Sequence, residues 1–134
     1  MGLKKVYFNK VKELGLKPDE LQIEAIQELQ EIIEQLNSKK ISKFNFFNKS
    51  IYPQINGLYM WGGVGRGKTF IMDIFYNEIP TTKKKRQHFS HFMKDMHARL
   101  RSFHGNKNPI SKVALEIAKE TQIICFDEFF VEDI

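Results

Sequence analysis

Residues 57–69 read GLYMWGGVGRGKT, a short apolar stretch that leads into the pattern G-x-x-x-x-G-K-T. Glycines in such a pattern let the backbone turn through conformations that side chains forbid, so that its N–H groups can close around a chain of phosphates. A helix that begins near residue 67 would add its positive N-terminal end to the same anion. The pattern therefore predicts a phosphate-binding loop made of Gly62, Gly63, Val64, Gly65, Arg66, Gly67, Lys68 and Thr69.

Two side chains of this loop have predicted roles of their own. The ammonium of Lys68 is expected against the β and γ phosphates, and the hydroxyl of Thr69 has the size and hardness to hold Mg²⁺. The flanking sequence agrees, because residues 58–61 favour a strand and residues 68–77 carry the dense apolar face of a buried helix. A glycine-rich hairpin turn is the alternative, but it requires neither the lysine nor the strand-to-helix setting.

A second motif, TQIICFDE at residues 121–128, ends in two adjacent carboxylates. Residues 123–126 are continuously apolar, as in a parallel strand covered on both faces. Asp127, at the carboxyl end of this strand, is a candidate to hold Mg²⁺ through its water shell. Glu128, pointing the other way, is a candidate general base for an attacking water. Two acids can also simply mark the exposed end of a strand, but their pairing with the loop favours an ATPase, with Lys68 and Glu128 as catalytic residues.

The segments GLYMWGGVGRGKT, HFSHFM and KETQIICFDEFFVEDI together resemble the ZapE cell-division ATPases of bacteria, whose mitochondrial relatives are called AFG-one-like ATPases. The resemblance is weak over residues 10–36 and strong over residues 57–134, and CFDEFFVEDI is its most distinctive part. The family usually reads HFHRFM in the second segment, so this chain has Ser90 and His91 in place of a histidine and an arginine. The roles of those two positions in relatives are therefore not carried over.

The resemblance implies an α/β fold of the P-loop NTPase type, similar to AAA+ proteins, in which helices flank a parallel sheet. It also implies ATP and Mg²⁺ as cofactors, a homo-oligomer in the full-length form, and ATP hydrolysis that remodels a protein partner, the division ring polymer. The implied setting is the bacterial cytoplasm, with recruitment to the division site and peripheral association with the inner membrane. A mitochondrial setting is less favoured. The alternative function is a nucleotide-gated nucleic-acid binder of the helicase-loader type, which FDEFFVEDI does not favour.

The chain is short for this family, and we interpret it as an N-terminal fragment. Residues 1–56 are predicted to form a helical segment and connector, and residues 57–134 a nucleotide-binding core that is truncated after the strand carrying Asp127. By resemblance to AAA+ ATPases, the strand between residues 58–61 and 122–126, the polar sensor, the arginine finger and the helical lid would come later. We expect such a fragment to be marginally stable, to self-associate through open strand edges and to hydrolyse ATP near background.

Composition indicates a soluble intracellular protein of one domain or less. The 134 residues are 42% hydrophobic, carry a net charge of +5 and include one cysteine, which excludes a disulfide framework. Cys125 is expected to be a small core residue rather than a reactive thiol. The basic run KKKR at residues 83–86 is expected in a solvated loop, with a patch for nucleic acid or anionic lipid as the alternative.

The remaining sequence predicts further helices and one strand. Asp19 and Gln22 have the spacing of a capping box at the start of an amphipathic helix; Gln22 is also a candidate adenine contact, and capping accounts for it equally well. The helix should present one apolar face made of Leu21, Ala25, Leu29, Ile32, Ile33 and Leu36.

Downstream, residues 37–56 should form a connector whose aromatic residues pack on the core, in preference to stacking on single-stranded nucleic acid. A strand is predicted over residues 87–90, a helix from His91 to about residue 103, and another helix from Pro109 through Glu120. The four histidines, at positions 88, 91, 97 and 104, do not form a pattern typical of zinc ligands.

Overall fold

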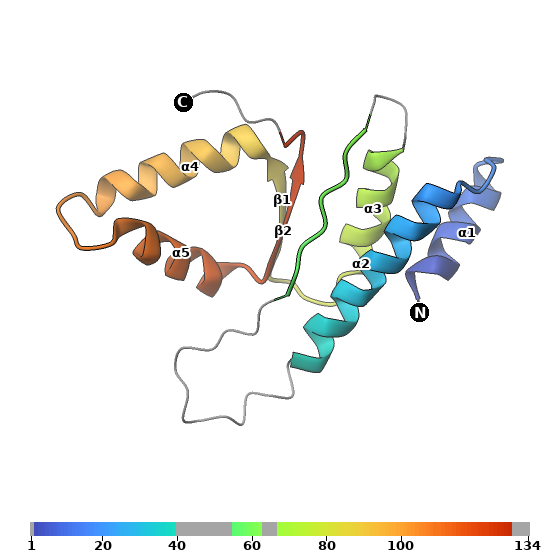
Figure 1. Ribbon diagram of the computed structural model, residues 1–134, viewed down its shortest axis with the longest axis horizontal. Helices are drawn as coiled ribbons and strands as arrows, with labels where there is room; N and C mark the ends of the chain where they lie inside the picture. Colours follow the sequence, from blue (N-terminus) through green and yellow to red (C-terminus); the bar gives the residue numbers. More distant parts are fainter. Residues whose placement is uncertain (1, 40–54, 63–66, 130–134) are drawn as a thin grey trace. The chain divides into compact units, whose positions relative to one another are not determined.

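A computed structural model of the chain describes residues 2–39, 55–62 and 67–129. The helices are α1 (Leu3–Glu13), α2 (Glu20–Lys39), α3 (Lys68–Glu78), α4 (Phe89–Ser102) and α5 (Pro109–Glu120), and the strands are β1 (Lys84–His88) and β2 (Ile123–Asp127) (Figure 1). The chain divides into two compact units, Met1–Pro80 (unit 1) and Thr81–Ile134 (unit 2), which are described one at a time. The mixed α/β class agrees with the sequence, and the predicted boundary between residues 56 and 57 stays a prediction.

Unit 1 is built from helices α1, α2 and α3, each of which packs against the other two. On every helix the buried apolar residues recur three or four positions apart, so that one face of each helix meets a shared core. On α2 this face is centred on Ile26, while Leu21, which was expected to belong to it, is 62% exposed. The buried side chains of unit 1 are Leu3, Tyr7, Val11, Ile26, Leu29, Ile33, Ile71, Ile74, Phe75 and Ile79.

The start of α2 is capped, as the sequence predicted, but with an added tyrosine. Asp19 Oδ1 accepts the backbone N–H groups of Leu21 at 2.8 Å and Gln22 at 3.3 Å. In a capping box the Gln22 side chain would itself accept the backbone N–H of Asp19. Here the hydroxyl of buried Tyr7 lies between them: it accepts the N–H of Asp19 at 3.1 Å and donates to Gln22 Oε1 at 2.8 Å. Helix α1 lies in the predicted helical segment 1–56, although its bounds were not predicted, and it carries Tyr7 into this position.

The strand predicted over residues 58–61 is absent from the structure, and this prediction was wrong. Residues 55–62 are described, but none of them is assigned to a strand or a helix. A strand requires a hydrogen-bonded neighbour, and the two-stranded sheet of the described residues consists of β1 and β2 alone. Alternating β-favouring residues therefore do not suffice here to form a strand.

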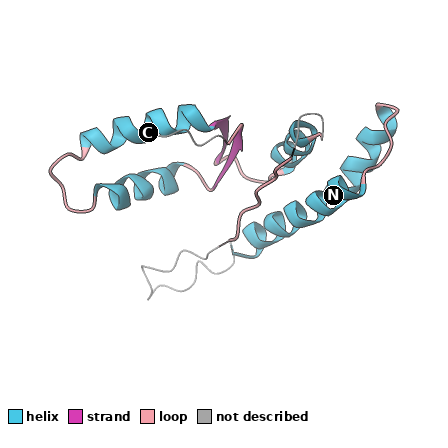
Figure 2. Cartoon of the chain, turned by 45° about the horizontal axis from the view of Figure 1, so that its top comes forward, coloured by secondary structure: helices cyan, strands magenta, loops and turns pink. Residues whose placement is uncertain are grey.

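The sheet of unit 2 pairs β1 with β2 in parallel, in register from Lys84 opposite Ile123 to His88 opposite Asp127 (Figure 2). Two sequence predictions need correction. The strand expected over residues 87–90 begins at Lys84 and ends at His88, and the basic run at 83–86 contributes three residues to it rather than forming a loop. The sequence KKRQH has no apolar alternation, so pairing with the apolar strand β2 determines its structure.

Strand β2 is less enclosed than its apolar sequence suggested. Only its central residue, Cys125, is buried, and the other four residues are half-buried. The expected core position of Cys125 is confirmed, and desolvation raises the pKa of its thiol to about 11, so the reactive thiolate is disfavoured. The expectation of full cover on both faces of the strand is wrong for the described structure.

Helices α4 and α5 pack against each other and are linked by one arginine. Arg99 contacts Asp95 at 3.0 Å, Glu116 at 3.4 Å and Glu120 at 2.9 Å, which joins the last turn of α5 to α4. The hydrogen bond from Arg99 lowers the pKa of Glu120. Helix α4 begins at Phe89, two residues before the predicted start, whereas α5 has the predicted bounds.

The predicted aromatic connector lies largely outside the described residues, which resume at residue 55. Its first residues, 37–39, belong instead to the end of α2. Across the described ranges, no helix combines the length and the apolar character that a membrane span requires.

Candidate nucleotide-binding site

The lysine of the predicted loop lies at the first position of α3. Its Nζ donates a hydrogen bond of 2.6 Å to the carbonyl oxygen of Gly62, which places the ammonium where the extended segment 55–62 ends. Thr69 follows in the first turn of α3 and is exposed. Four of the predicted loop residues, 63–66, lie outside the described residues. The described parts of the loop therefore bring together a cation, a hydroxyl and the start of a helix.

Two observations bear on Gly67 at the start of α3. Its φ of 72° lies in the left-handed region, which glycine adopts at little cost. In addition, a Cβ at this position would collide with Nε2 of Gln22. The side chain of Gln22 therefore lies directly against Gly67, which brings α2 close to the start of α3.

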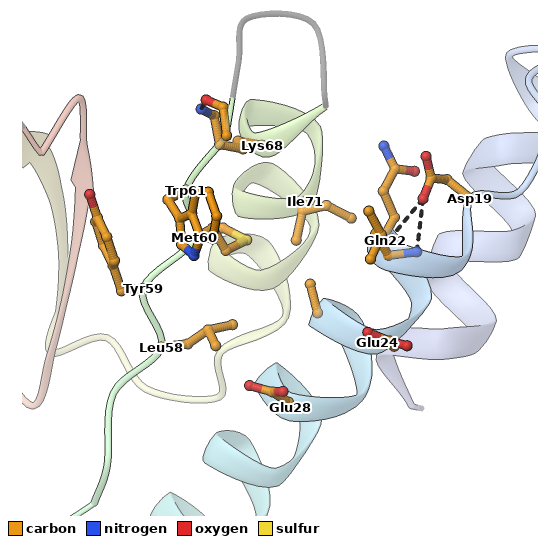
Figure 3. A pocket seen from close by; sticks show the side chains of 13 residues that line it. Asp19, Gln22, Glu24, Glu28, Leu58, Tyr59, Met60, Trp61, Lys68 and Ile71 are labelled. Atoms are coloured by element: carbon orange, nitrogen blue, oxygen red, sulfur yellow. Dashed lines mark hydrogen bonds between the residues drawn. The ribbon is translucent and has the colours of Figure 1, made fainter.

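A pocket of about 590 Å³ runs from Lys68 along helix α2 (Figure 3). This volume falls within the range of roughly 300–1,000 Å³ that is typical of small-molecule sites. Two large side chains that line it are unusually exposed, Tyr59 at 64% and Trp61 at 82%. The pocket is lined by Asp19, Leu21, Gln22, Glu24, Ala25, Glu28, Leu58, Tyr59, Met60, Trp61, Gly62, Lys68 and Ile71.

The predicted metal-binding acid, Asp127, is the last residue of β2 and forms a two-pronged ion pair with Arg86 of β1. Arg86 Nε donates to Oδ2 at 2.8 Å and Nη2 donates to Oδ1 at 3.0 Å. Hydrogen bonding from this guanidinium holds the pKa of Asp127 below its usual range, so the carboxyl is ionised. The side chains of Arg86 and Asp127 are 21% and 27% exposed, which leaves the pair accessible from solvent.

Glu128, the predicted general base, immediately follows β2 with a backbone φ of 51°. Its side chain is 82% exposed, and its Oε2 lies 3.6 Å from Nδ1 of His88. The next residue, Phe129, turns back onto Phe89, with ring centroids 4.3 Å apart, and onto Phe126. Aromatic packing on both sides of Glu128 in the sequence thus fixes the turn that presents its carboxylate.

The predicted site residues fall into the two units. Lys68 and Thr69 belong to unit 1, and Asp127 and Glu128 belong to unit 2. In the described ranges, no group of three or more His, Cys, Asp or Glu side chains could hold a metal ion. The roles of these residues toward phosphate, metal and water remain predictions.

Two residues of the site were missed by sequence reasoning. Tyr7 lies in a segment noted only for its basic charge, and the contact with Gln22 spans 15 positions of sequence. Arg86 was counted within the basic run, although its position two residues before the end of a strand parallel to β2 would have placed it near Asp127. The sequence would therefore have indicated the contact between Arg86 and Asp127 if β1 had been predicted with its correct bounds.

The parallel strands and their helices define a mixed α/β protein, and a helix that starts at the G-K-T sequence points to the nucleotide-binding members of that class. The chain belongs to the AFG1-like ATPase family, whose model matches residues 1–134. Membership implies a P-loop NTPase fold, and the family is one of ATPases. The resemblance stated from the sequence is thereby confirmed.

Individual relatives agree with the family assignment. The chain is 38% identical over 141 aligned residues to cell division protein ZapE of Escherichia coli (strain K12), an alignment that covers 96% of this chain and 38% of ZapE. It is 40% identical over 112 residues to lactation elevated protein 1 homolog B of Danio rerio, covering 75% of this chain and 22% of that protein. The chain thus spans well under half the length of these relatives. No solved structure matches it significantly.

Proposed function

We propose that the chain binds Mg·ATP at the start of α3, with the triphosphate enclosed by the loop 62–69. The observation that carries this proposal is the position of Lys68, whose ammonium lies at the carbonyl of Gly62 and also lines the pocket along α2. A polyphosphate requires such a point charge, and the N–H groups in the first turn of α3 are those that a helix cannot satisfy internally.

For hydrolysis we assign Glu128 as the general base that accepts a proton from the attacking water. Its high exposure makes the carboxylate available to that water, and its positive φ supports a functional role, since such angles cost about 1 kcal/mol or more and concentrate at functional sites. Thr69 and Asp127 would hold Mg²⁺, Asp127 through water. The ion, when bound, would neutralise charge on the phosphate oxygens.

We further propose that ATP turnover is coupled to remodelling of a protein partner. The support is the likeness to ZapE, which is named a cell division protein, and the division ring polymer is the partner that this likeness favours. The active form would be a homo-oligomer in the cytoplasm, recruited to the division site with peripheral contact to the inner membrane. Domains at residues 1–56 and 57–134 belong to the same proposal.

The partner can be tested by the stimulation of turnover. In a protein of the relatives' length that carries this chain (the longer protein), we expect phosphate release to rise when a division ring polymer is added and to stay unchanged with single-stranded DNA. Stimulation by DNA alone would instead support the helicase-loader alternative. Phosphate release is measured at steady state. The Glu128→Gln variant serves as the blank, because any phosphate that its preparation releases comes from contaminating enzymes.

A second prediction concerns Gln22, the candidate adenine contact. Gln22→Ala should weaken ATP binding by about three- to tenfold, the usual value of one hydrogen bond, because Gln22 lines the pocket beside Lys68. Affinity for inorganic tripolyphosphate, which has no base, should stay unchanged in the same calorimetric titration. Gln27→Ala, an exposed glutamine on the same helix, is the control. Equal weakening for both ligands would show that Gln22 supports the loop and does not contact the base.

A further inference from the structure

The ion pair between Arg86 and Asp127 uses both oxygens of the carboxylate. One guanidinium nitrogen lies at 2.8 Å from Oδ2 and another at 3.0 Å from Oδ1, which is the bidentate arrangement that arginine forms and lysine cannot. The pair therefore does more than neutralise Asp127, because it also uses one lone pair on each carboxylate oxygen and so rules out bidentate binding of a cation on that side.

Strand β1 adds one further cation, Lys84, on the same face. Lys84, Arg86 and His88 occupy alternate positions, and they lie opposite Ile123, Cys125 and Asp127 in the parallel ladder. Alternate residues of a strand point to one side, so the cationic side chains of Lys84 and Arg86 and the imidazole of His88, which lies 3.6 Å from the Glu128 carboxylate, project from the face that carries Asp127. A bare divalent cation that approaches Asp127 meets a basic strip with the two cations Lys84 and Arg86, together with an acid that is already paired.

We infer that Arg86 is a positioning residue that keeps Asp127 from binding a free divalent cation and so reserves it for a metal that arrives with a nucleotide. This inference rests on the proposed function, in which Asp127 helps to hold Mg²⁺. Mg·ATP carries net negative charge and is attracted by the basic strip, whereas the free ion is repelled. The same guanidinium thus discriminates between the two forms in which the metal can reach the site.

Nucleotide-free Mn²⁺ binding, followed by the loss of the free-ion EPR signal, tests this inference. Arg86→Gln should bind Mn²⁺ about tenfold more tightly than the wild type, an estimate for removing one charge near a half-exposed site. Arg86→Lys keeps the positive charge but cannot form the bidentate hydrogen bonds, so its Mn²⁺ affinity should lie between those of the wild type and Arg86→Gln. Arg101→Gln, the same substitution at an exposed position of α4, should leave Mn²⁺ affinity unchanged.

Other surface carboxylates also bind Mn²⁺ weakly. A further variant must therefore show that the tighter Mn²⁺ binding of Arg86→Gln takes place at Asp127. The double variant Arg86→Gln, Asp127→Asn should lose the tenfold gain, because the acid that Arg86 released is no longer present. If Arg86→Gln or Arg86→Lys remains folded by circular dichroism and Mn²⁺ affinity does not change, the pair only links the two strands and the inference is wrong. A gain that persists in the double variant would overturn it as well.

A failure of this inference can be distinguished from a failure of the proposed function. ATP binding measured with excess chelator depends on Lys68 and the loop but not on Asp127. If the wild type binds ATP and Arg86→Gln has the Mn²⁺ affinity of the wild type, only the role of Arg86 is rejected and the proposed function stands. Loss of ATP binding in the wild type would reject the proposed function, and the inference with it.

Discussion

Replacing Lys68 by alanine is expected to weaken Mg·ATP binding by about 10- to 100-fold, since hydrogen bonds to a charged group contribute roughly 1.5–3 kcal/mol. The ammonium is the cation that the structure places at the start of α3, and the substitution removes it while the backbone of the loop remains. Isothermal titration calorimetry of the purified protein with Mg·ATP measures the change directly.

The matched control is Lys5→Ala, which removes an exposed lysine from α1 in the same unit and should leave ATP affinity unaltered. Thermal melting of Lys68→Ala should stay close to that of the wild type, because the hydrogen bond that Lys68 donates to Gly62 is exposed. Equal ATP affinity in Lys68→Ala and the wild type would show that the nucleotide does not bind at this loop.

The second large effect is expected at Glu128. In the longer protein, Glu128→Gln should leave ATP binding nearly intact and reduce turnover by roughly 10²- to 10⁴-fold, because an amide keeps the shape of the side chain but cannot accept the proton of water. ATP binding by calorimetry and phosphate release at steady state are to be measured on the same preparation. Phosphate release at the wild-type rate would exclude Glu128 as the base.

Two comparisons make this result specific. Glu31→Gln, at an exposed position of α2, makes the same chemical change away from the site and should leave turnover unaltered. Asp127→Asn should instead raise the Mg²⁺ concentration that is needed for ATP binding, since Asp127 is the proposed metal ligand. The two adjacent acids are thereby distinguished: the Glu128 variant changes the rate of turnover, and the Asp127 variant changes the Mg²⁺ dependence of ATP binding.

Local sequence signals predicted several elements well because their causes are local. Pro109 at the first position of α5 and the acidic cap Asp19 of α2 act through neighbours within one helical turn. The start of α3 after Gly67 and the end of β2 at Asp127 also follow from patterns within a few residues. Each of these predictions agrees with the structure.

The predictions that failed depend on partners distant in sequence. Strand β1 is polar, and its extended conformation comes from pairing with β2, about 40 residues later. Residues 58–61 have strand-like composition but no strand partner among the described residues, so composition alone was misleading. The contacts of Arg86 with Asp127 and of Tyr7 with Gln22 likewise join separate elements, and no local pattern encodes them.

Tyr7 of α1, whose hydroxyl contacts the start of α2, also orients the side chain of Gln22 in the pocket wall. The Tyr7 hydroxyl accepts the N–H of Asp19 and donates its single proton to Gln22 Oε1, so these two hydrogen bonds hold the oxygen end of the amide towards Tyr7. The Nε2 end of Gln22 is therefore directed towards Gly67, so one hydroxyl of α1 sets which end of this amide lies at the start of α3.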